Sequence, residues 1–350
     1  MAYSTVNKST EHYNTVLYTG THSSSSQAVT GVGFQPDWCW LKNRDSNGYD
    51  HRTYDAVRGA TKLLNINTTN AEGTDAQGLY SFNSDGFSVG TGNGDNNNGD
   101  NYASFNWKAN GAGSSNTDGN ITSTVSANTT AGFSIVRYTG NNNNAQTVGH
   151  GLGVAPKMIL IKRLGIGVAG TADWVVYHKS ITAAKHLHIN TTAVESTDNG
   201  MFNSTDPTSS VFTIHAGDDV NKNNDQFIAY CFAEIKGFSK IGRYAGTGSN
   251  TFIYTGFKPT LIIGKEYSAS NGYNWHLFTP KLTGRFEPSN NTTEYTDYPR
   301  VVDYCSNGFR WGTSLNNWDN SDGRFYIYYA VGQTMVGTND IPCTAGSTDG

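Results

Sequence analysis

The sequence predicts an all-β protein made of three tandem, diverged antiparallel β-sandwich domains of the lectin-like or jelly-roll-like kind. Three observations predict this fold class: an internal repeat, an apolar period of two within each copy, and a composition rich in turn-forming and aromatic residues. The 350 residues include 40 Gly, 20 Tyr and 16 Phe but only 8 Pro, which suits short strands joined by loops. The chain exceeds the roughly 100 to 200 residues usual for one domain, so two or three domains are expected.

The internal repeat is clearest in an apolar strand that follows a proline and ends on a lysine. The three copies read "QPDWCWLK" (35 to 42), "APKMILIK" (155 to 162) and "KPTLIIGK" (258 to 265). The lysine always lies six residues after the proline, and a tyrosine heads each copy. The equivalent residues are Tyr18, Tyr138 and Tyr244, then Pro36, Pro156 and Pro259, then Lys42, Lys162 and Lys265.

Later motifs keep the same order in each copy. An Asn-Thr-Thr stretch occurs in "LNINTTNAE" (64 to 72), "LHINTTAVE" (187 to 195) and "PSNNTTE" (288 to 294). A short strand with an equivalent phenylalanine follows, and each copy closes on an aromatic strand. We expect the shared rings to be mostly core because they recur while the loops vary. These rings include Tyr18, Tyr138, Tyr244, Phe87, Phe212 and Phe309.

These motifs divide the chain into three repeats with flanking segments. Residues between the first two repeats show no apolar periodicity, which indicates a linker, whereas the second and third repeats abut directly. The predicted segments are an N-terminal arm (1–12), repeat 1 (13–111), the linker (112–132), repeat 2 (133–237), repeat 3 (238–337) and a C-terminal tail (338–350).

Within a copy the apolar residues alternate, as in Trp38 and Trp40 or Phe105 and Trp107. This period of two is typical of half-buried antiparallel strands rather than of helices. Helix is expected to be nearly absent. The best candidate, residues 55–64, contains Gly59 and is interpreted as a single turn or the beginning of a strand.

Charge and hydropathy exclude several classes of protein. Charged residues make up 15% and the net charge is −4, so no basic surface is expected to bind nucleic acid. No apolar run approaches the roughly 20 residues that span a bilayer, and the start "MAYSTVNKST" lacks a signal-peptide pattern. Synthesis in the cytoplasm without membrane insertion is therefore expected. The cysteines are widely spaced, and Cys39 and Cys231 lie in apolar strand-like runs, so disulfides are not expected.

The run "NGDNNNGDN" (93 to 101) resembles a calcium-binding loop in composition only. Counted from Asp95, an EF-hand would need Gly at the sixth position and Glu at the twelfth, where this chain has Asp100 and Asn106. Its counterparts, "DDVNKNND" (218 to 225) and "LNNWDNSDG" (315 to 323), are polar hairpin connections. We interpret all three as turns and expect no metal and no cofactor, with incidental calcium as the alternative.

Two other patterns are weaker than they look. "GIGVAG" (165 to 170) has the glycine spacing of a dinucleotide site but precedes a strand-like "WVVYHK" instead of the helix that such a site needs. His186 and His188 share one strand face and could bind zinc with His178 or His215. Since copy one has no equivalent histidines, we favour a loop for the first pattern and no metal for the second.

The sequence shows no clear set of catalytic residues. Glu72 and Glu195 are repeat-equivalent and Glu294 lies near the same place, which favours a structural role over the paired carboxylates of a glycosidase. No G-x-S-x-G elbow occurs. A binding or structural module explains a three-fold repeat better than an enzyme, because catalysis usually breaks the symmetry in one copy.

The motifs "GFQPDWCWLKNR", "FNWKANG" and "VGHGLGVAPKMILIKR" resemble a domain that recurs in virion proteins of marine bacteriophages, including those of cyanobacteria and SAR11-type hosts. The resemblance is close from about residue 12 to 237 and weaker in the third copy. It implies a virion surface protein, either a tail-fibre or appendage subunit or a capsid decoration protein. It also implies virion partners, a homo-oligomer or many copies per particle, and some host-surface or glycan adhesion. A tail-associated polysaccharide-degrading enzyme is the alternative.

Residues that differ between the copies are better candidates for binding than those that recur. Trp318 lies with Asn317 and Asp319 in the polar loop of copy three, where copy one has only Asn, Asp and Gly. A ring among amides and carboxylates is the usual make-up of a sugar platform. We therefore predict glycan binding by these three residues, with packing of Trp318 on its own domain or on a neighbouring subunit as the alternative.

Overall fold

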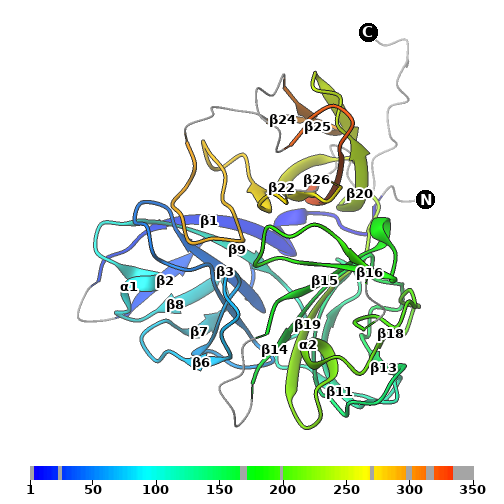
Figure 1. Cartoon of the computed structure of the whole chain (residues 1–350). Helices are drawn as coiled ribbons and strands as arrows, with labels where there is room; N and C mark the ends of the chain where they lie inside the picture. The colour runs from blue at the N-terminus through cyan, green and yellow to red at the C-terminus, as the bar shows by residue number, and fades with distance from the viewer. Residues whose placement is uncertain are drawn as a thin grey trace.

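The computed structural model describes residues 4–22, 26–165, 172–197, 200–268, 272–296, 302–312 and 319–333. Nearly all regular structure in these ranges is β-strand, arranged in several antiparallel sheets (Figure 1), so the all-β prediction is confirmed. The helical elements of the described residues are short: η1 (Ser9–Glu11), α1 (Asn93–Asn96), η2 (Lys179–Ile181) and α2 (Asp218–Asn221).

Each repeat contributes one large sheet. The first has the order β1 (Tyr13–Thr19), β9 (Asn101–Trp107), β3 (Trp38–Asn43), β4 (Arg52–Asp55), β5 (Lys62–Asn65) and β6 (Gly73–Thr74). The second has the order β10 (Ser114–Asn116), β11 (Ser123–Asn128), β12 (Phe133–Thr139), β19 (Gln226–Phe232), β14 (Met158–Arg163), β15 (Val175–His178), β16 (Lys185–His188) and β17 (Ser196–Thr197). The third has the order β20 (Ser239–Ala245), β26 (Phe325–Gln333), β22 (Lys258–Glu266) and β23 (His276–Phe278).

The registers of these sheets repeat to the residue. Two positions after the repeat proline, Trp38 pairs with Trp107 on β9, and the equivalent pairs are Met158 with Phe232 and Leu261 with Val331. The strands that run from proline to lysine are therefore equivalent, as the fixed spacing predicts.

Each repeat also has a small sheet. These sheets are β2 (Gln27–Thr30), β8 (Gly86–Val89) and β7 (Leu79–Asn83); β13 (Gln146–Gly149) with β18 (Val211–Ile214); and β21 (Thr251–Tyr254), β25 (Gly308–Trp311) and β24 (Val302–Cys305). Separate apolar clusters lie between the small sheet and the large sheet of each repeat. Phe87, Phe212 and Phe309 are fully buried in these clusters, which confirms that they are core.

The tyrosine that heads each repeat stacks on a ring of the closing strand. Tyr138 is buried, as predicted, whereas Tyr18 and Tyr244 are only partly buried, so the core prediction holds for them in part. The ring centroids of Tyr18 and Tyr102 lie 5.0 Å apart, those of Tyr138 and Phe227 lie 5.2 Å apart, and those of Tyr244 and Tyr326 lie 4.9 Å apart.

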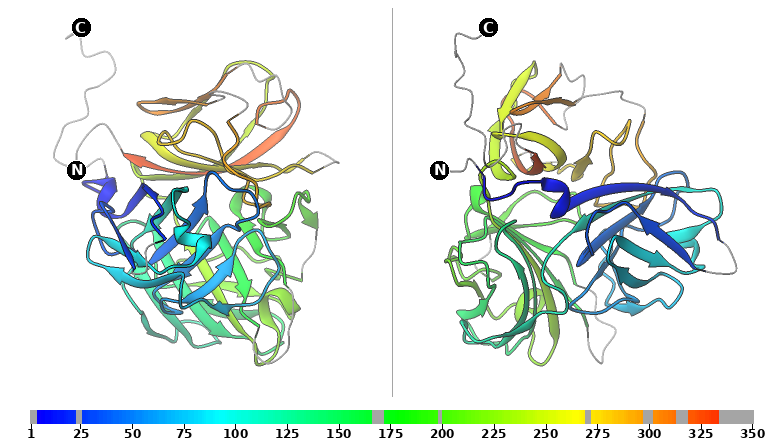
Figure 2. Two further views of the ribbon diagram at one scale, coloured as in Figure 1. Left: turned by 90° about the vertical axis from the view of Figure 1, so that its left-hand side faces the viewer. Right: turned by 180° about the vertical axis from the view of Figure 1, so that it is seen from behind.

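One further apolar core is shared by all three large sheets. In Figure 1 the first repeat (blue to cyan) lies at lower left, the second (green) at lower right and the third (yellow to red) above them, and the right-hand view of Figure 2 shows the same three lobes from behind. Trp38 of the first repeat stacks on Tyr230 of the second with centroids 4.4 Å apart, and Phe232 contacts Tyr329 of the third at 4.9 Å. The repeats are therefore packed round a common centre rather than strung along a line.

The three repeat-equivalent lysines join neighbouring repeats. All three are at most 2% exposed, and the ammonium of each donates to a backbone carbonyl in the Asn-Thr-Thr stretch of another repeat. The contacts are Lys42 Nζ to Asn291 O at 3.5 Å, Lys162 Nζ to Thr69 O at 3.0 Å and Lys265 Nζ to Thr192 O at 3.2 Å. We call these three contacts the lysine locks. They run from repeat 1 to 3, from 2 to 1 and from 3 to 2, and so close a circle.

Each lock lysine also donates to a loop carbonyl of its own repeat, namely Tyr49, Ala172 or Tyr273. Burial lowers the pKa of Lys42 and Lys162 to about 8 and that of Lys265 to about 7. The carbonyl bonds satisfy an ammonium that would otherwise be costly to bury.

The segment predicted as a linker (112–132) contains strands β10 and β11, which extend the second large sheet. Periodicity did not reveal β11 because one of its buried positions is polar. Ser123 lies on the same strand face as the apolar Val125, and its hydroxyl donates to Gly149 O at 3.0 Å. The helical candidate 55–64 is not a helix. It contains a turn, with Gly59 at a φ of 98°, and then the beginning of β5, so both expected interpretations apply to part of it.

Cys39 and Cys231 are buried free thiols, as their apolar setting predicts, and Cys305 is also free. No helix among the described residues is long and apolar enough to cross a membrane.

Candidate ligand-binding site in the third repeat

The polar connections predicted as turns are fixed by equivalent hydrogen bonds. The hydroxyl of the heading tyrosine donates to a backbone carbonyl in the connection of its own repeat: Tyr18 to Asp95 O at 2.8 Å, Tyr138 to Val220 O at 2.7 Å and Tyr244 to Asp319 O at 2.6 Å. The next residue is a fully buried asparagine whose side-chain oxygen accepts from the backbone after the first strand: Asn96, Asn221 and Asn320. These bonds make Asp95, Val220 and Asp319 equivalent positions.

The side chain at this position differs between the repeats, and so does the side chain that it contacts on a strand of the large sheet. In the first repeat Arg52 Nε lies 3.3 Å from Asp95 Oδ1, and burial raises the pKa of that carboxyl group. The equivalent pair in the second repeat is apolar, Val175 and Val220. In the third, His276 Nδ1 lies 2.5 Å from Asp319 Oδ1. Asp319 thus occupies a structural position shared by the repeats.

The predicted glycan residues have different outcomes. Trp318 and Asn317 lie outside the described residues. Asp319 is only 8% exposed, and one oxygen of its carboxylate is bonded to His276. Its direct contact with a ligand, like that of the other two residues, stays a prediction.

The two carboxylates of "NGDNNNGDN" have protein partners. Besides Arg52, Asp95 accepts from Tyr54 OH at 2.7 Å, and Asp100 accepts from Asn43 Nδ2, Ser46 Oγ and Asn97 Nδ2 at 2.8 to 2.9 Å. A short helical turn, α1, forms the first half of this connection. These contacts support the turn interpretation.

The other patterns show no site in the described residues. His186 and His188 have ring centroids 5.0 Å apart, but no group of three His, Cys, Asp or Glu side chains within the described ranges could hold a metal ion. His178 Nε2 is 3.3 Å from Tyr328 O of the third repeat, and burial lowers the pKa of His178 to about 4. The "GIGVAG" stretch lies outside the described residues from position 166 onward.

The three glutamates form ion pairs. Glu72 lies 3.4 Å from Arg58, Glu195 pairs with Lys185, and Glu294 lies 2.8 Å from Arg44 of the first repeat. Glu294 also accepts from the amide of Gly284 at 2.7 Å. Each glutamate directly precedes a paired residue: Gly73 and Ser196 pair at the edges of the first two large sheets, and Tyr295 forms an isolated bridge with Arg285. These contacts agree with the structural role expected from their repetition.

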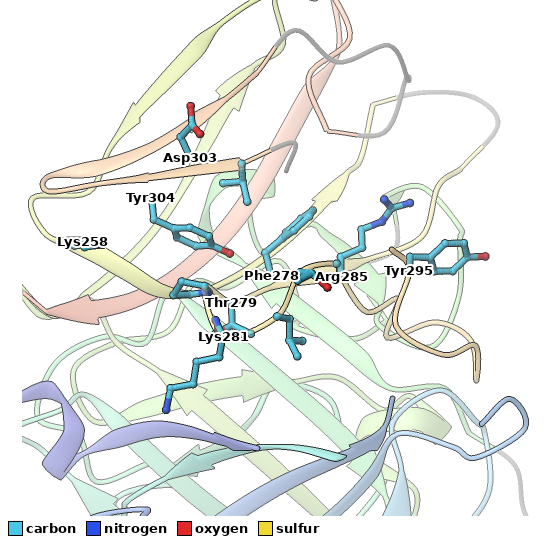
Figure 3. A pocket seen from close by; sticks show the side chains of 13 residues that line it. Lys258, Phe278, Thr279, Lys281, Arg285, Tyr295, Asp303 and Tyr304 are labelled. Carbon is cyan, nitrogen blue, oxygen red and sulfur yellow. Dashed lines mark hydrogen bonds between the residues drawn. The ribbon is translucent and has the colours of Figure 1, made fainter. Parts of the chain in front are cut away.

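An open hollow of about 750 Å³ lies in the third repeat, between the end of β23, the chain that follows it and strand β24 (Figure 3). This volume is in the range of small-molecule sites, about 300 to 1,000 Å³. The lining combines aromatic, hydroxyl and cationic side chains. It consists of Lys258, Phe278, Thr279, Pro280, Lys281, Leu282, Thr283, Gly284, Arg285, Tyr295, Val302, Asp303 and Tyr304.

Two parts of the lining are held rigidly. The guanidinium of Arg285 lies 5.2 Å from the ring centroid of Tyr295 and donates to Glu287 Oε1 at 3.2 Å. Lys281 donates to Thr15 O and lies 3.3 Å from Asn14 Oδ1, so it ties this wall to β1 of the first repeat. The walls are therefore supported before any ligand arrives.

The hollow was not predicted from the sequence. Its residues lie on four separate stretches between positions 258 and 304, and their nearness depends on how the sheets of the third repeat pack. A comparison of the repeats offers one signal. Arg285 and Tyr295 pair across strands where the first repeat has Leu63 with Gly73 and the second has His186 with Ser196.

The profile of one protein family, described as a domain of unknown function (DUF7483), matches residues 8–334. No curated protein matches the chain, and no solved structure matches it. The match runs through all three repeats without a break.

Proposed function

The chain belongs to the DUF7483 family, and we propose that it is a structural protein on the surface of a bacteriophage particle that also adheres to host glycans. It would act as a tail-fibre or appendage subunit or as a capsid decoration protein. Its partners would be other virion proteins, in a homo-oligomer or in many copies per particle. The resemblance of its repeat motifs to marine phage virion proteins supports this assignment.

The circle of lysine locks is the observation that carries the structural role. Side chains that recur in all three repeats are used to bind one repeat to the next, as Lys162 Nζ does at Thr69 O. A shared apolar core and a closed set of contacts give a rigid three-lobed body, which suits a particle component that must survive outside a cell. Three β-sandwich domains of the lectin-like kind are the finer architecture that we propose for this body.

The third repeat is the part that we assign to adhesion. The hollow lies in this repeat, and so does the loop with Trp318 and Asn317. Phe252 and Tyr254 on β21 are 48% and 60% exposed. The two rings lie two residues apart and so on one face of the strand, and a contiguous exposed apolar patch marks an interaction surface.

The geometry favours binding over hydrolysis. A glycosidase needs two carboxyl groups facing the scissile bond, about 5 to 9.5 Å apart. The side chains that line the hollow include a single carboxylate, Asp303, which is paired with Arg310 at 2.5 Å. We therefore propose that the chain is not an enzyme.

Labelling of intact particles tests the proposal. Antibodies raised against the purified chain should decorate gradient-purified particles of the phage that encodes it, and mass spectrometry should find many copies per particle. Pre-immune serum and an antibody against a non-virion phage protein are the controls. If the chain occurs only in infected-cell lysate and never with particles, the proposal is wrong.

A further inference from the structure

Aromatic rings and an unused hydroxyl face the hollow of the third repeat. In Figure 3 the ring of Tyr304 points into the space above Thr279, opposite Phe278, and Tyr295 lies at the far side beside Arg285. Among the described residues, no group forms a hydrogen bond with the Tyr304 hydroxyl. Burial raises the pKa of this hydroxyl well above the usual value. A half-buried hydroxyl without a partner is available to a ligand, and an aromatic wall suits the C–H face of a sugar ring.

The charges of the lining are not balanced. Arg285 is neutralised by buried Glu287, and Asp303 by Arg310. Lys258 forms no ion pair within the described residues and is exposed. The ammonium of Lys281 points away from the hollow, toward β1, where it donates to Thr15 O (Figure 3). One uncompensated ammonium group, that of Lys258, beside a neutralised carboxylate makes the hollow attractive to an anion.

The residues that create this environment are specific to the third repeat. Strand register places Leu63 and His186 at the position of Arg285, and Gly73 and Ser196 at the position of Tyr295. Packing shared by the repeats therefore does not require an arginine stacked on a tyrosine here. Features present in one copy only are better candidates for recognition than those in all three.

We infer that the hollow binds an acidic saccharide, with a sugar ring against Tyr304, with Tyr295 at the far side, and with a carboxylate beside Lys258. The Tyr304 hydroxyl would bond a ring hydroxyl. This inference rests on the adhesion part of the proposed function and is independent of the location on a particle.

Calorimetry with the full chain tests the inference. Oligogalacturonate is the acidic probe, its galactose-based neutral counterpart is the matched control, and free galacturonic acid separates a polysaccharide site from a site for single sugar acids. We expect oligogalacturonate to bind at least tenfold more tightly than the neutral oligosaccharide, and 0.5 M salt to weaken this preference because it screens the charge of Lys258.

Two variants place the binding in the hollow. Tyr304→Phe keeps the ring and removes only the hydroxyl, so it should weaken binding about five- to tenfold, whereas Tyr80→Phe on β7 of the first repeat should have no effect. Lys258→Gln should weaken binding of the acidic probe alone, whereas Lys8→Gln, at an exposed site on the N-terminal arm, should not. Melting temperatures of the four variants check that they fold.

Several outcomes would overturn the inference: no binding of either oligosaccharide, equal binding of the neutral one, or binding that Tyr304→Phe leaves unchanged. Failure here with the chain still present on particles refutes the acidic-saccharide site and leaves the structural function standing. Binding that depends on Tyr304, in a chain absent from particles, supports the site and refutes the virion location.

Discussion

The ammonium of Lys162, in the second repeat, donates a hydrogen bond of 3.0 Å to the backbone carbonyl of Thr69, in the first. The carbonyl of Thr69 also accepts from the amide of Ala172 at 3.0 Å. Two donors of one repeat thus converge on one acceptor of another. Since Lys42 and Lys265 make equivalent contacts, the repeats hold each other in a ring.

Lys162→Met should loosen the contact between the first two repeats. The variant keeps an unbranched apolar side chain but removes the ammonium donor. The carbonyl of Ala172 then loses the hydrogen bond that it accepts from Lys162. A buried polar group that loses its partner costs about 1 to 3 kcal/mol of unfolding free energy. Urea unfolding measures this loss, and hydrogen exchange should show faster opening of residues 65–72 in the other repeat. Lys8→Met, at an exposed ion pair, should change neither quantity. If the two variants behave alike, the locks do not stabilise the ring.

The lock lysines should make stability rise with pH. Burial lowers the pKa of Lys265 to about 7 and those of Lys42 and Lys162 to about 8, against about 10.4 for an unfolded lysine. Between these values the unfolded chain binds more protons than the folded one, so raising the pH favours folding, by at most about 1.4 kcal/mol per pH unit for each lysine.

Melting temperatures between pH 6.5 and 9.5 measure this effect. The native chain should melt higher as the pH rises through this window, and Lys265→Met should have a shallower slope. Lys8→Met serves again as the control and should keep the native slope. A slope that Lys265→Met leaves unaltered would show that this lysine does not titrate as described.

Phe212→Ala should strongly destabilise the second repeat. Phe212 is fully buried between the small and large sheets and contacts Tyr138 with centroids 6.1 Å apart. Truncation of a buried phenylalanine costs about 3 to 5 kcal/mol because it leaves a cavity. Phe252→Ala, on the exposed face of β21, should cost less than about 1 kcal/mol. An unchanged melting temperature in the Phe212 variant would contradict its core position.

A double-mutant cycle tests the pair formed by Arg52 and Asp95. Arg52→Val alone leaves the carboxylate of Asp95 buried with Tyr54 as its main remaining partner and should cost about 3 to 5 kcal/mol. Adding Asp95→Val recreates the apolar pair of the second repeat, Val175 with Val220, and should recover part of that loss. Chemical denaturation of the four proteins gives the coupling energy. Additive losses would mean that the two positions do not act as a pair.

Much of the fold could be predicted because it depends on local patterns. Alternating residues such as Trp38 and Trp40 identify strands, and the fixed distance from Pro36 to Lys42 predicts the repeated register. Strand β11 was not predicted because a polar residue, Ser123, occupies one of its buried positions. The repeat alignment could also have revealed the substitution of Arg52 and Asp95 by two valines.

The arrangement of the repeats and the hollow could not be predicted in this way. The lysine locks end on backbone carbonyls, and a carbonyl of Thr69 is chemically the same as that of any other residue. The sequence around Lys162 therefore does not identify the carbonyl that accepts its hydrogen bond. The hollow likewise depends on where Tyr304 lies relative to Thr279, which is set by long-range packing rather than by local pattern.

A subunit-resolved electron-microscopy map of the phage particle would show whether the chain is a surface component. We expect three-lobed density on the particle surface that fits the ring of repeats joined by Lys42, Lys162 and Lys265, with the hollow beside Tyr304 facing outward. Surface density in which every subunit is accounted for by other proteins would contradict this expectation.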